Sequence, residues 1–102
     1  MKVGFIGLGN VGGKLAGTLI RNNIPTFVHD IKQSAARQLI KQGGVWLDSP
    51  ASIAFNSDII ITCLPSPQAS ASVIEGKKGI LTAASREKIW IEMRPHKMLS
   101  LI

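Results

Sequence analysis

The feature that most constrains this chain is an apolar stretch that runs directly into three spaced glycines. Residues 2–6 are rich in β-branched and aromatic side chains, and Gly7, Gly9 and Gly12 follow with the spacing G-x-G-x-x-G. Apolar side chains then recur at helical spacing from residue 11 to residue 20. A strand that ends in such a turn and opens into a helix presents backbone N–H groups to a pyrophosphate. The pattern predicts a dinucleotide-binding turn.

Each glycine of this motif has a predicted role. Gly7 allows the tight turn, Gly9 lets the backbone approach the pyrophosphate without an intervening Cβ, and Gly12 lets the helix pack against the strand. The spacing alone is a weak signal because glycine-rich turns are common. The position of Asp30 strengthens it, because this acid follows a second predicted strand at about the expected distance from the motif.

Asp30 also bears on the choice of cofactor. At the end of the second strand its carboxylate is placed to accept hydrogen bonds from the adenosine ribose hydroxyls. The same charge repels a 2′-phosphate, so Asp30 favours NAD over NADP. Lys32 lies two residues further on and could accommodate the phosphate, which leaves NADP as the alternative cofactor.

The rest of the chain alternates between short apolar runs and helical patterns. We expect strands at residues 2–6, 26–29, 45–47, 59–62 and 89–93, and helices at 11–20, 34–42, 50–56, 66–74 and 81–85. The inward positions of the first helix are predicted to be Val11, Leu15, Ala16, Leu19 and Ile20, and those of the second Ala35, Ala36, Leu39 and Ile40. Ser49 is the expected N-cap of the third helix, with Pro50 at its first position.

Five such alternations with short links predict an α/β fold of the Rossmann type. The sheet is expected to be parallel and doubly wound, with right-handed crossovers and the strand order 3-2-1-4-5. A chain of 102 residues is long enough for a single domain of this size, which we place at residues 1–93. Residues 94–102 form an atypical C-terminal tail.

Composition limits the other classes of function. The net charge is +6, but no aromatic residues alternate with the basic ones, so we expect a solvated basic face and no nucleic-acid partner. No apolar run reaches the about 20 residues that a bilayer-spanning helix needs, and residues 1–12 do not resemble a signal peptide. The single cysteine, Cys63, fits a reducing compartment. We therefore expect a cytoplasmic protein with no membrane partner.

Several residues with reactive or metal-binding side chains are expected to have structural roles only. Cys63 is expected to be a buried small hydrophobe, and Asp58 to end a helix or turn. His29 and His96 lack metal-ligand spacing, so no metal site is predicted. Leu64 and Pro65 end the fourth strand, after the topological switch point, where the backbone is predicted to line the same crevice as the glycines. A simple loop proline is the alternative at Pro65.

Three stretches, GFIGLGNVG, SPASIAFNSDIIITCLP and EGKKGILTAASREKIWIEM, together resemble the N-terminal domain of the β-hydroxyacid dehydrogenases. That family includes 3-hydroxyisobutyrate dehydrogenase, tartronate semialdehyde reductase and 6-phosphogluconate dehydrogenase. The resemblance covers residues 2–93 and favours the 3-hydroxyisobutyrate branch, because the motif continues as LGNVG and the second strand ends in Asp30. It implies that Leu8, Asn10, Val11, Leu64 and Pro65 join the three glycines and Asp30 in holding NAD or NADP.

By the same resemblance, the family oxidises a β-hydroxyacid by passing a hydride to the cofactor. The lysine that handles the hydroxyl proton and the substrate loop lie beyond this domain, so no catalytic residue is expected here and this chain alone is expected to be inactive. The alternative is a non-catalytic Rossmann-fold interaction module. An open sheet edge would then favour self-association.

The tail departs from the family pattern at Arg94. The family continues after the fifth strand with a Ser-Thr pair, whereas this chain has Arg94 and Pro95. One added nucleotide in a permitted coding sequence converts residues 94–102 to Ser-Thr-Thr-Gln-Asp-Ala-Glu-Ser-Asp, which resembles the family continuation. We therefore hypothesise a reading-frame shift or truncation, with a natural short form as the alternative.

Overall fold

The structure is a computed structural model that describes residues 1–64, 73, 79 and 88–93. Four features predicted from the sequence lie outside these residues. They are Pro65, most of the helix at 66–74, the helical turn at 81–85 and the tail at 94–102.

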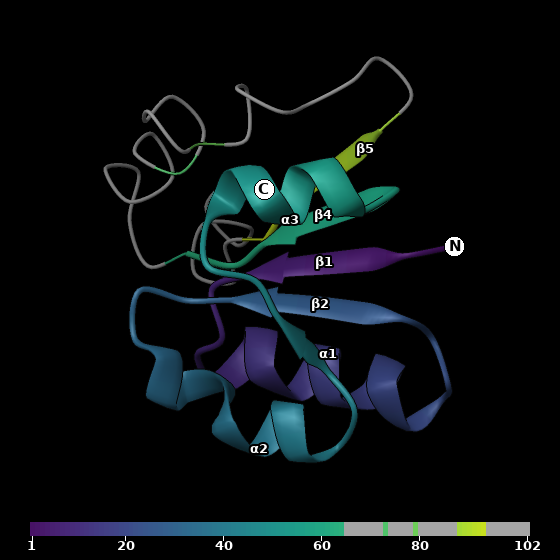
Figure 1. The fold of residues 1–102 in the computed structure, drawn as a ribbon, viewed down its shortest axis with the longest axis vertical. Helices are drawn as coiled ribbons and strands as arrows, with labels where there is room; N and C mark the ends of the chain where they lie inside the picture. Colours follow the sequence, from purple (N-terminus) through teal and green to yellow (C-terminus); the bar gives the residue numbers. More distant parts are fainter. Residues whose placement is uncertain (65–72, 74–78, 80–87, 94–102) are drawn as a thin grey trace, which may run out of the picture.

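The strands form a five-stranded parallel sheet with the order β3-β2-β1-β4-β5 (Figure 1), as predicted. The strands are β1 (Val3–Ile6), β2 (Thr26–His29), β3 (Val45–Trp46), β4 (Ile59–Thr62) and β5 (Ile89–Glu92). Ile6, at the end of β1, is in register with His29 of β2 and Thr62 of β4. The carboxyl ends of these three strands therefore lie side by side, and the segments that follow them meet at this end of the strands.

Helices cover both faces of the sheet (Figure 1). The segments α1 (Asn10–Arg21), η1 (Gln33–Ala36) and α2 (Arg37–Lys41) lie on one face, and α3 (Pro50–Asn56) lies on the other. Phe5 points into a core with Ala16 and Leu39, whereas its neighbour Ile6 joins Ile53 in a second core under α3. This alternation is what a strand covered on both faces requires.

Two predicted helix faces differ from the observed ones. The second helix begins as the 3-10 segment η1, which has three residues per turn. Its side chains therefore point in directions that differ from those expected of an α-helix. Ala36 and Leu39 are buried as predicted, whereas Ala35 and Ile40 are exposed, so the prediction that these two point inward is wrong. In α1, Val11 and Leu15 are exposed because the buried face contains the glycines, which bring the helix closer to its neighbours.

The predicted start of α3 is confirmed. Ser49 is the N-cap, and its Oγ accepts a hydrogen bond of 3.1 Å from the backbone N–H of Ser52. Pro50 occupies the first turn, where its missing N–H leaves no hydrogen bond unmade. Among the helices described, none combines the length and the apolar character needed to cross a membrane.

Candidate functional site

The candidate site is the turn between β1 and α1, at the carboxyl ends of the strands. The N–H of Gly7 donates to the carbonyl oxygen of His29 at 3.0 Å, and the N–H of Cys63 donates to that of Ile6 at 2.9 Å. The turn is thus held by the strands on both sides of β1. In parallel α/β sheets, ligands bind at this kind of position, outside the carboxyl ends of the strands.

Gly7 adopts a backbone conformation that favours glycine. Its φ is +98°, and a Cβ built on it would collide with the carbonyl oxygen of Cys63. The structure confirms the tight turn predicted at this position. It also shows that the turn packs directly on the residue that follows β4.

Gly12 is buried in the first turns of α1. A Cβ at this position would collide with the carbonyl oxygen of Gly7 and would lie 3.2 Å from the Cβ of Cys63. The absence of a side chain therefore lets α1 pack against the ends of β1 and β4, as predicted for the last glycine of the motif.

Gly9 differs from the other two glycines. It is the N-cap of α1 and is exposed, and a Cβ built on it would meet no atom of the described residues within 4 Å. No side chain caps the helix, and its first turn contains no acidic residue. Within the described part of the chain, the first N–H groups of α1 and the positive end of the helix dipole therefore face open space beside Gly9. This space suits a negatively charged group.

Asp30 follows β2 and lies beside the same turn. Its Oδ2 accepts a hydrogen bond of 2.8 Å from the N–H of Leu8, and its Oδ1 accepts one of 3.0 Å from the N–H of Lys32. Leu8 itself is buried in the core beneath the turn. Sequence reasoning placed Asp30 near the glycines but missed the bond to Leu8, because no sequence pattern specifies which donor a carboxylate will meet.

The remaining predicted residues lie around this turn. Asn10 and Val11 form the exposed start of α1. Leu64 is half-buried, packs on the core under α3, and has a Cδ2 atom 3.1 Å from the Cβ position of Gly7. The structure therefore brings together eight of the predicted site residues, namely Gly7, Leu8, Gly9, Asn10, Val11, Gly12, Asp30 and Leu64. Pro65 lies outside the described residues.

Cys63 and Asp58, for which we predicted structural roles, lie close to the strands. Cys63 is a half-buried free thiol beneath Gly7 and Gly12, a position that could have been inferred only from the pairing of β4 with β1. Asp58 ties the start of β4 to the N-terminus, because its Oδ2 accepts a hydrogen bond of 2.8 Å from the N–H of Lys2. In the described part of the chain, no three His, Cys, Asp or Glu side chains are grouped to hold a metal.

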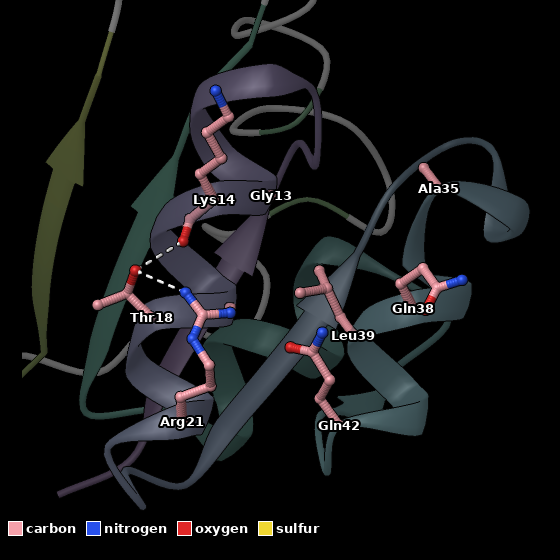
Figure 2. A pocket seen from close by; sticks show the side chains of 9 residues that line it. Gly13, Lys14, Thr18, Arg21, Ala35, Gln38, Leu39 and Gln42 are labelled. Atoms are coloured by element: carbon pink, nitrogen blue, oxygen red, sulfur yellow. Dashed lines mark hydrogen bonds between the residues drawn. The ribbon is translucent and has the colours of Figure 1, made fainter.

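A separate groove of about 520 Å³ runs between α1 and α2 (Figure 2). Its lining contains two cations, several amide and hydroxyl groups and no carboxylate. The lining residues are Gly13, Lys14, Gly17, Thr18, Arg21, Ala35, Gln38, Leu39 and Gln42. Arg21 Nη2 donates to Thr18 Oγ1 at 3.3 Å, and Thr18 Oγ1 donates to the carbonyl oxygen of Lys14 at 3.0 Å. None of the predicted site residues lines this groove, which is part of a basic helical surface.

The parallel sheet of order 3-2-1-4-5, the glycine-rich turn and the acid after β2 define a Rossmann-type dinucleotide-binding domain. A family model described as the NAD-binding domain of 6-phosphogluconate dehydrogenase matches residues 2–98. The chain belongs to this family of NAD-binding domains. The match extends past the domain boundary that we placed at residue 93.

Similar proteins show which type of dehydrogenase contains this domain. The mitochondrial 3-hydroxyisobutyrate dehydrogenase of Rattus norvegicus is 37% identical over 90 residues, which cover 88% of this chain and 27% of that protein. This chain therefore spans about a quarter of the length of that curated relative. It corresponds to the NAD-binding domain of 3-hydroxyisobutyrate dehydrogenase-type enzymes, so the resemblance to the β-hydroxyacid dehydrogenases is confirmed.

Solved structures agree on the fold. Psf3 in complex with NADP+ and 2-OPP superimposes with a TM-score of 0.84 at 25% identity, over 97% of this chain and 36% of Psf3. The 3-hydroxyisobutyrate dehydrogenase of Mycobacterium tuberculosis, solved with L-serine, has a TM-score of 0.81 at 23% identity. That match covers 89% of this chain and 30% of the enzyme.

Proposed function

We propose that the turn at residues 7–12 holds the pyrophosphate of a nicotinamide dinucleotide against the N-terminus of α1. One observation supports this more than any other. The packing of the protein itself requires Gly7 and Gly12 to lack a side chain, whereas none of the residues that the structure describes approaches the Cβ position of Gly9. The glycine at position 9 is therefore explained by a ligand that needs the space, and an anion suits the free N–H groups there.

The other predicted residues receive roles from their places around the turn. The backbone at Leu8, Asn10 and Val11 borders the pyrophosphate, and Asp30 accepts hydrogen bonds from the adenosine ribose. Leu64 borders the crevice on the side of β4, and we propose the same role for Pro65, which lies outside the described residues. A carboxylate oxygen has room for more than one hydrogen bond, so the bonds that Asp30 makes to the backbone are compatible with ribose binding. NAD is the preferred cofactor, and Lys32 leaves NADP as the alternative.

The domain would serve an oxidoreductase that acts on a β-hydroxyacid. The bound dinucleotide supplies the hydride acceptor, and the residues of this chain bind and orient it. We assign no catalytic residue, since the described site contains glycines, apolar side chains, the amide of Asn10 and the carboxylate of Asp30, which already bonds the backbone. We expect the 102-residue chain to bind the cofactor without turnover.

A titration with NADH and NADPH, followed by tryptophan emission, tests the proposal. Gly9→Val should abolish NADH binding while the thermal melt stays close to that of the unmodified chain, because the added side chain enters open space. Thr18→Val is the matched control, a β-branched substitution at an exposed position of the same helix, and it should leave the affinity unchanged. Equal NADH affinity in Gly9→Val and the unmodified chain would contradict the proposed site.

A second candidate function is supported by the terminal strand of the described sheet. Among the described residues β5 pairs only with β4, and Ile89, Trp90 and Ile91 are 56%, 43% and 44% exposed. An apolar terminal strand favours pairing with another chain. We propose that a second copy of this protein associates along β5, which is also how a non-catalytic interaction module would use the fold.

We also propose a cytoplasmic location. The free thiol of Cys63 lies directly beneath the glycine-rich turn, so oxidation to a larger group would disturb the packing of Gly7 and Gly12. In a reducing compartment the Cys63 thiol is not oxidised to a larger group. Fractionation of cells that express a tagged chain would test the location, and recovery from an oxidising compartment would contradict it.

A further inference from the structure

The groove between α1 and α2 extends away from the glycine-rich turn. Asn10 begins α1 and Arg21 ends it, so these two residues are about 16 Å apart along the helix axis. The groove has a volume of about 520 Å³, and none of the described residues assigned to the dinucleotide lines it. Sites for small molecules usually have volumes of about 300–1,000 Å³. The groove is therefore large enough for a ligand of its own.

The guanidinium of Arg21 is held over Gly17 on the α1 side of this groove. Its Nη1 lies 3.1 Å from the Cβ position of Gly17, and its Nη2 donates a hydrogen bond of 3.3 Å to Thr18 Oγ1. Thr18 Oγ1 donates in turn to the carbonyl oxygen of Lys14 at 3.0 Å, which fixes the hydroxyl to the helix (Figure 2). A guanidinium has five N–H donors, and the bond to Thr18 is the one that this group makes within the described part of the chain. The group is thus oriented while most of its donors are left for a ligand.

Gln42, the C-cap of α2, borders the same space from the opposite side. Its Oε1 lies 3.6 Å from the Cβ position of Gly17, so the amide of Gln42 and the guanidinium of Arg21 approach each other over this glycine (Figure 2). A glutamine amide has two N–H donors beside its oxygen and can turn either end toward a ligand. The missing side chain at Gly17 therefore creates a space where donors from two helices converge.

The lining of the groove is positively charged. Lys14 lies about two helical turns before Arg21 on the same face of α1. Among the lining residues that the structure describes there is no carboxylate to neutralise these two cations. A concave surface lined by one sign of charge raises the local concentration of ions of the opposite sign. The groove therefore favours an anionic ligand.

We propose that this groove is a second ligand site, which binds the phosphate group of a small phosphorylated molecule between Arg21 and Gln42. Arginine can bind a phosphate through two parallel N–H···O bonds. Donors that approach from two helices suit a tetrahedral phosphate better than a planar carboxylate. Lys14 adds positive charge further along the groove, where the rest of the molecule lies. This site does not depend on dinucleotide binding at the glycine-rich turn.

A titration of the full chain with inorganic phosphate, followed by NMR, tests the site. Phosphate should shift the Arg21 Nε–H signal and the side-chain amide signals of Gln42. Arg21→Met should weaken phosphate binding, measured at the Gln42 signals, by about tenfold or more. Arg37→Met is the matched control, because it removes the same charge from an exposed arginine of α2 that does not line the groove. Equal weakening in the two variants would overturn the site, since attraction by the net charge alone would then explain the binding.

Gly17→Ala tests the space over the glycine while keeping both side chains. The added methyl group would lie 3.1 Å from Arg21 Nη1, so the flexible guanidinium must move, whereas the next nearest atoms lie at 3.6 Å. Phosphate affinity should fall by about threefold or more. The thermal melt should not fall, because alanine favours a helix more than glycine does. A folded Gly17→Ala variant with unchanged phosphate affinity would overturn the proposed position of the phosphate.

The Gly9→Val variant separates this site from the dinucleotide site. Inorganic phosphate should still shift the Arg21 signal in Gly9→Val, even where NADH binding is lost. Disappearance of the Arg21 shift in that variant would overturn a separate site. Two other probes test the class of ligand. Acetate that binds as tightly as phosphate would overturn the preference for phosphate, and an oligonucleotide that shifts the Arg21 signal at a lower phosphate concentration would overturn a small-molecule ligand.

Discussion

The carbonyl oxygen of Gly7 occupies the space that a side chain on Gly12 would need. The Cβ position of Gly12 overlaps this oxygen, so the backbone of the turn touches the backbone of α1 directly. Two glycines of one motif therefore depend on each other. The tight turn at Gly7 points its carbonyl at the helix, and only a glycine at position 12 can face that carbonyl.

This contact predicts a large effect on stability for Gly12→Ala. The added methyl group must displace backbone rather than a flexible side chain, so we expect the free energy of unfolding to fall by about 2–3 kcal/mol. Gly9→Ala is the control, because its methyl group meets no described atom and the substitution should lower stability by only about 0.5–1 kcal/mol, the cost of the poorer N-cap. Urea unfolding followed by circular dichroism measures both. Equal losses in the two variants would contradict the difference between the glycines.

Two serines at opposite ends of α3 should respond to alanine in opposite ways. Ser57 Oγ is buried, has no hydrogen-bond partner among the described residues and lies against the Cβ position of Gly4. Ser57→Ala removes an unsatisfied polar atom, so we expect no loss of stability and a gain of up to about 1 kcal/mol. Ser49→Ala removes the N-cap hydrogen bond and should lower stability by about 1 kcal/mol. Thermal melts of the two variants would decide, and a matching loss in both would be the contrary result.

Lys88 caps the C-terminal end of α3 from the start of β5. Its Nζ donates to the carbonyl oxygen of Ser57 at 2.7 Å and to that of Phe55 at 3.3 Å. Lys88→Met keeps the length of the side chain and removes the charge, so the free energy of unfolding should fall by about 1 kcal/mol. Lys14→Met, at an exposed lysine for which no side-chain hydrogen bond occurs in the described part of the chain, should change stability little. If both substitutions have the same effect in urea unfolding, the cap contributes nothing.

Association along β5 predicts a mass in solution above that of one chain. Light scattering of the unmodified protein should give a mass that rises with concentration above 10.9 kDa. Ile91→Lys places a charge on the exposed strand and should return the mass to that of the monomer. Ile40→Lys makes the same change at an exposed isoleucine of α2 and should not do so. A monomeric unmodified protein at every concentration would rule out this interface.

Much of the fold was accessible from the sequence because its determinants are local. The apolar run before Gly7, the acid after the second strand and the Ser49-Pro50 cap each depend on a few adjacent residues, and each lies where it was predicted. The faces of α1 and α2 were harder to predict. Val11 and Leu15 look buried by spacing, and Ala35 by the periodicity of an α-helix, but close packing at glycines and a 3-10 turn changed which residues point inward.

The sequence alone determined that this chain forms a doubly wound parallel sheet with a glycine-rich turn, because hydrophobic periodicity and the backbone freedom of glycine act over short segments. Only the tertiary structure decided which glycine faces open space and which donor holds Asp30. Those properties depend on distant segments that meet in space. β4 brings Cys63 beneath Gly7, and the pairing of β1 with β2 places Asp30 beside Leu8.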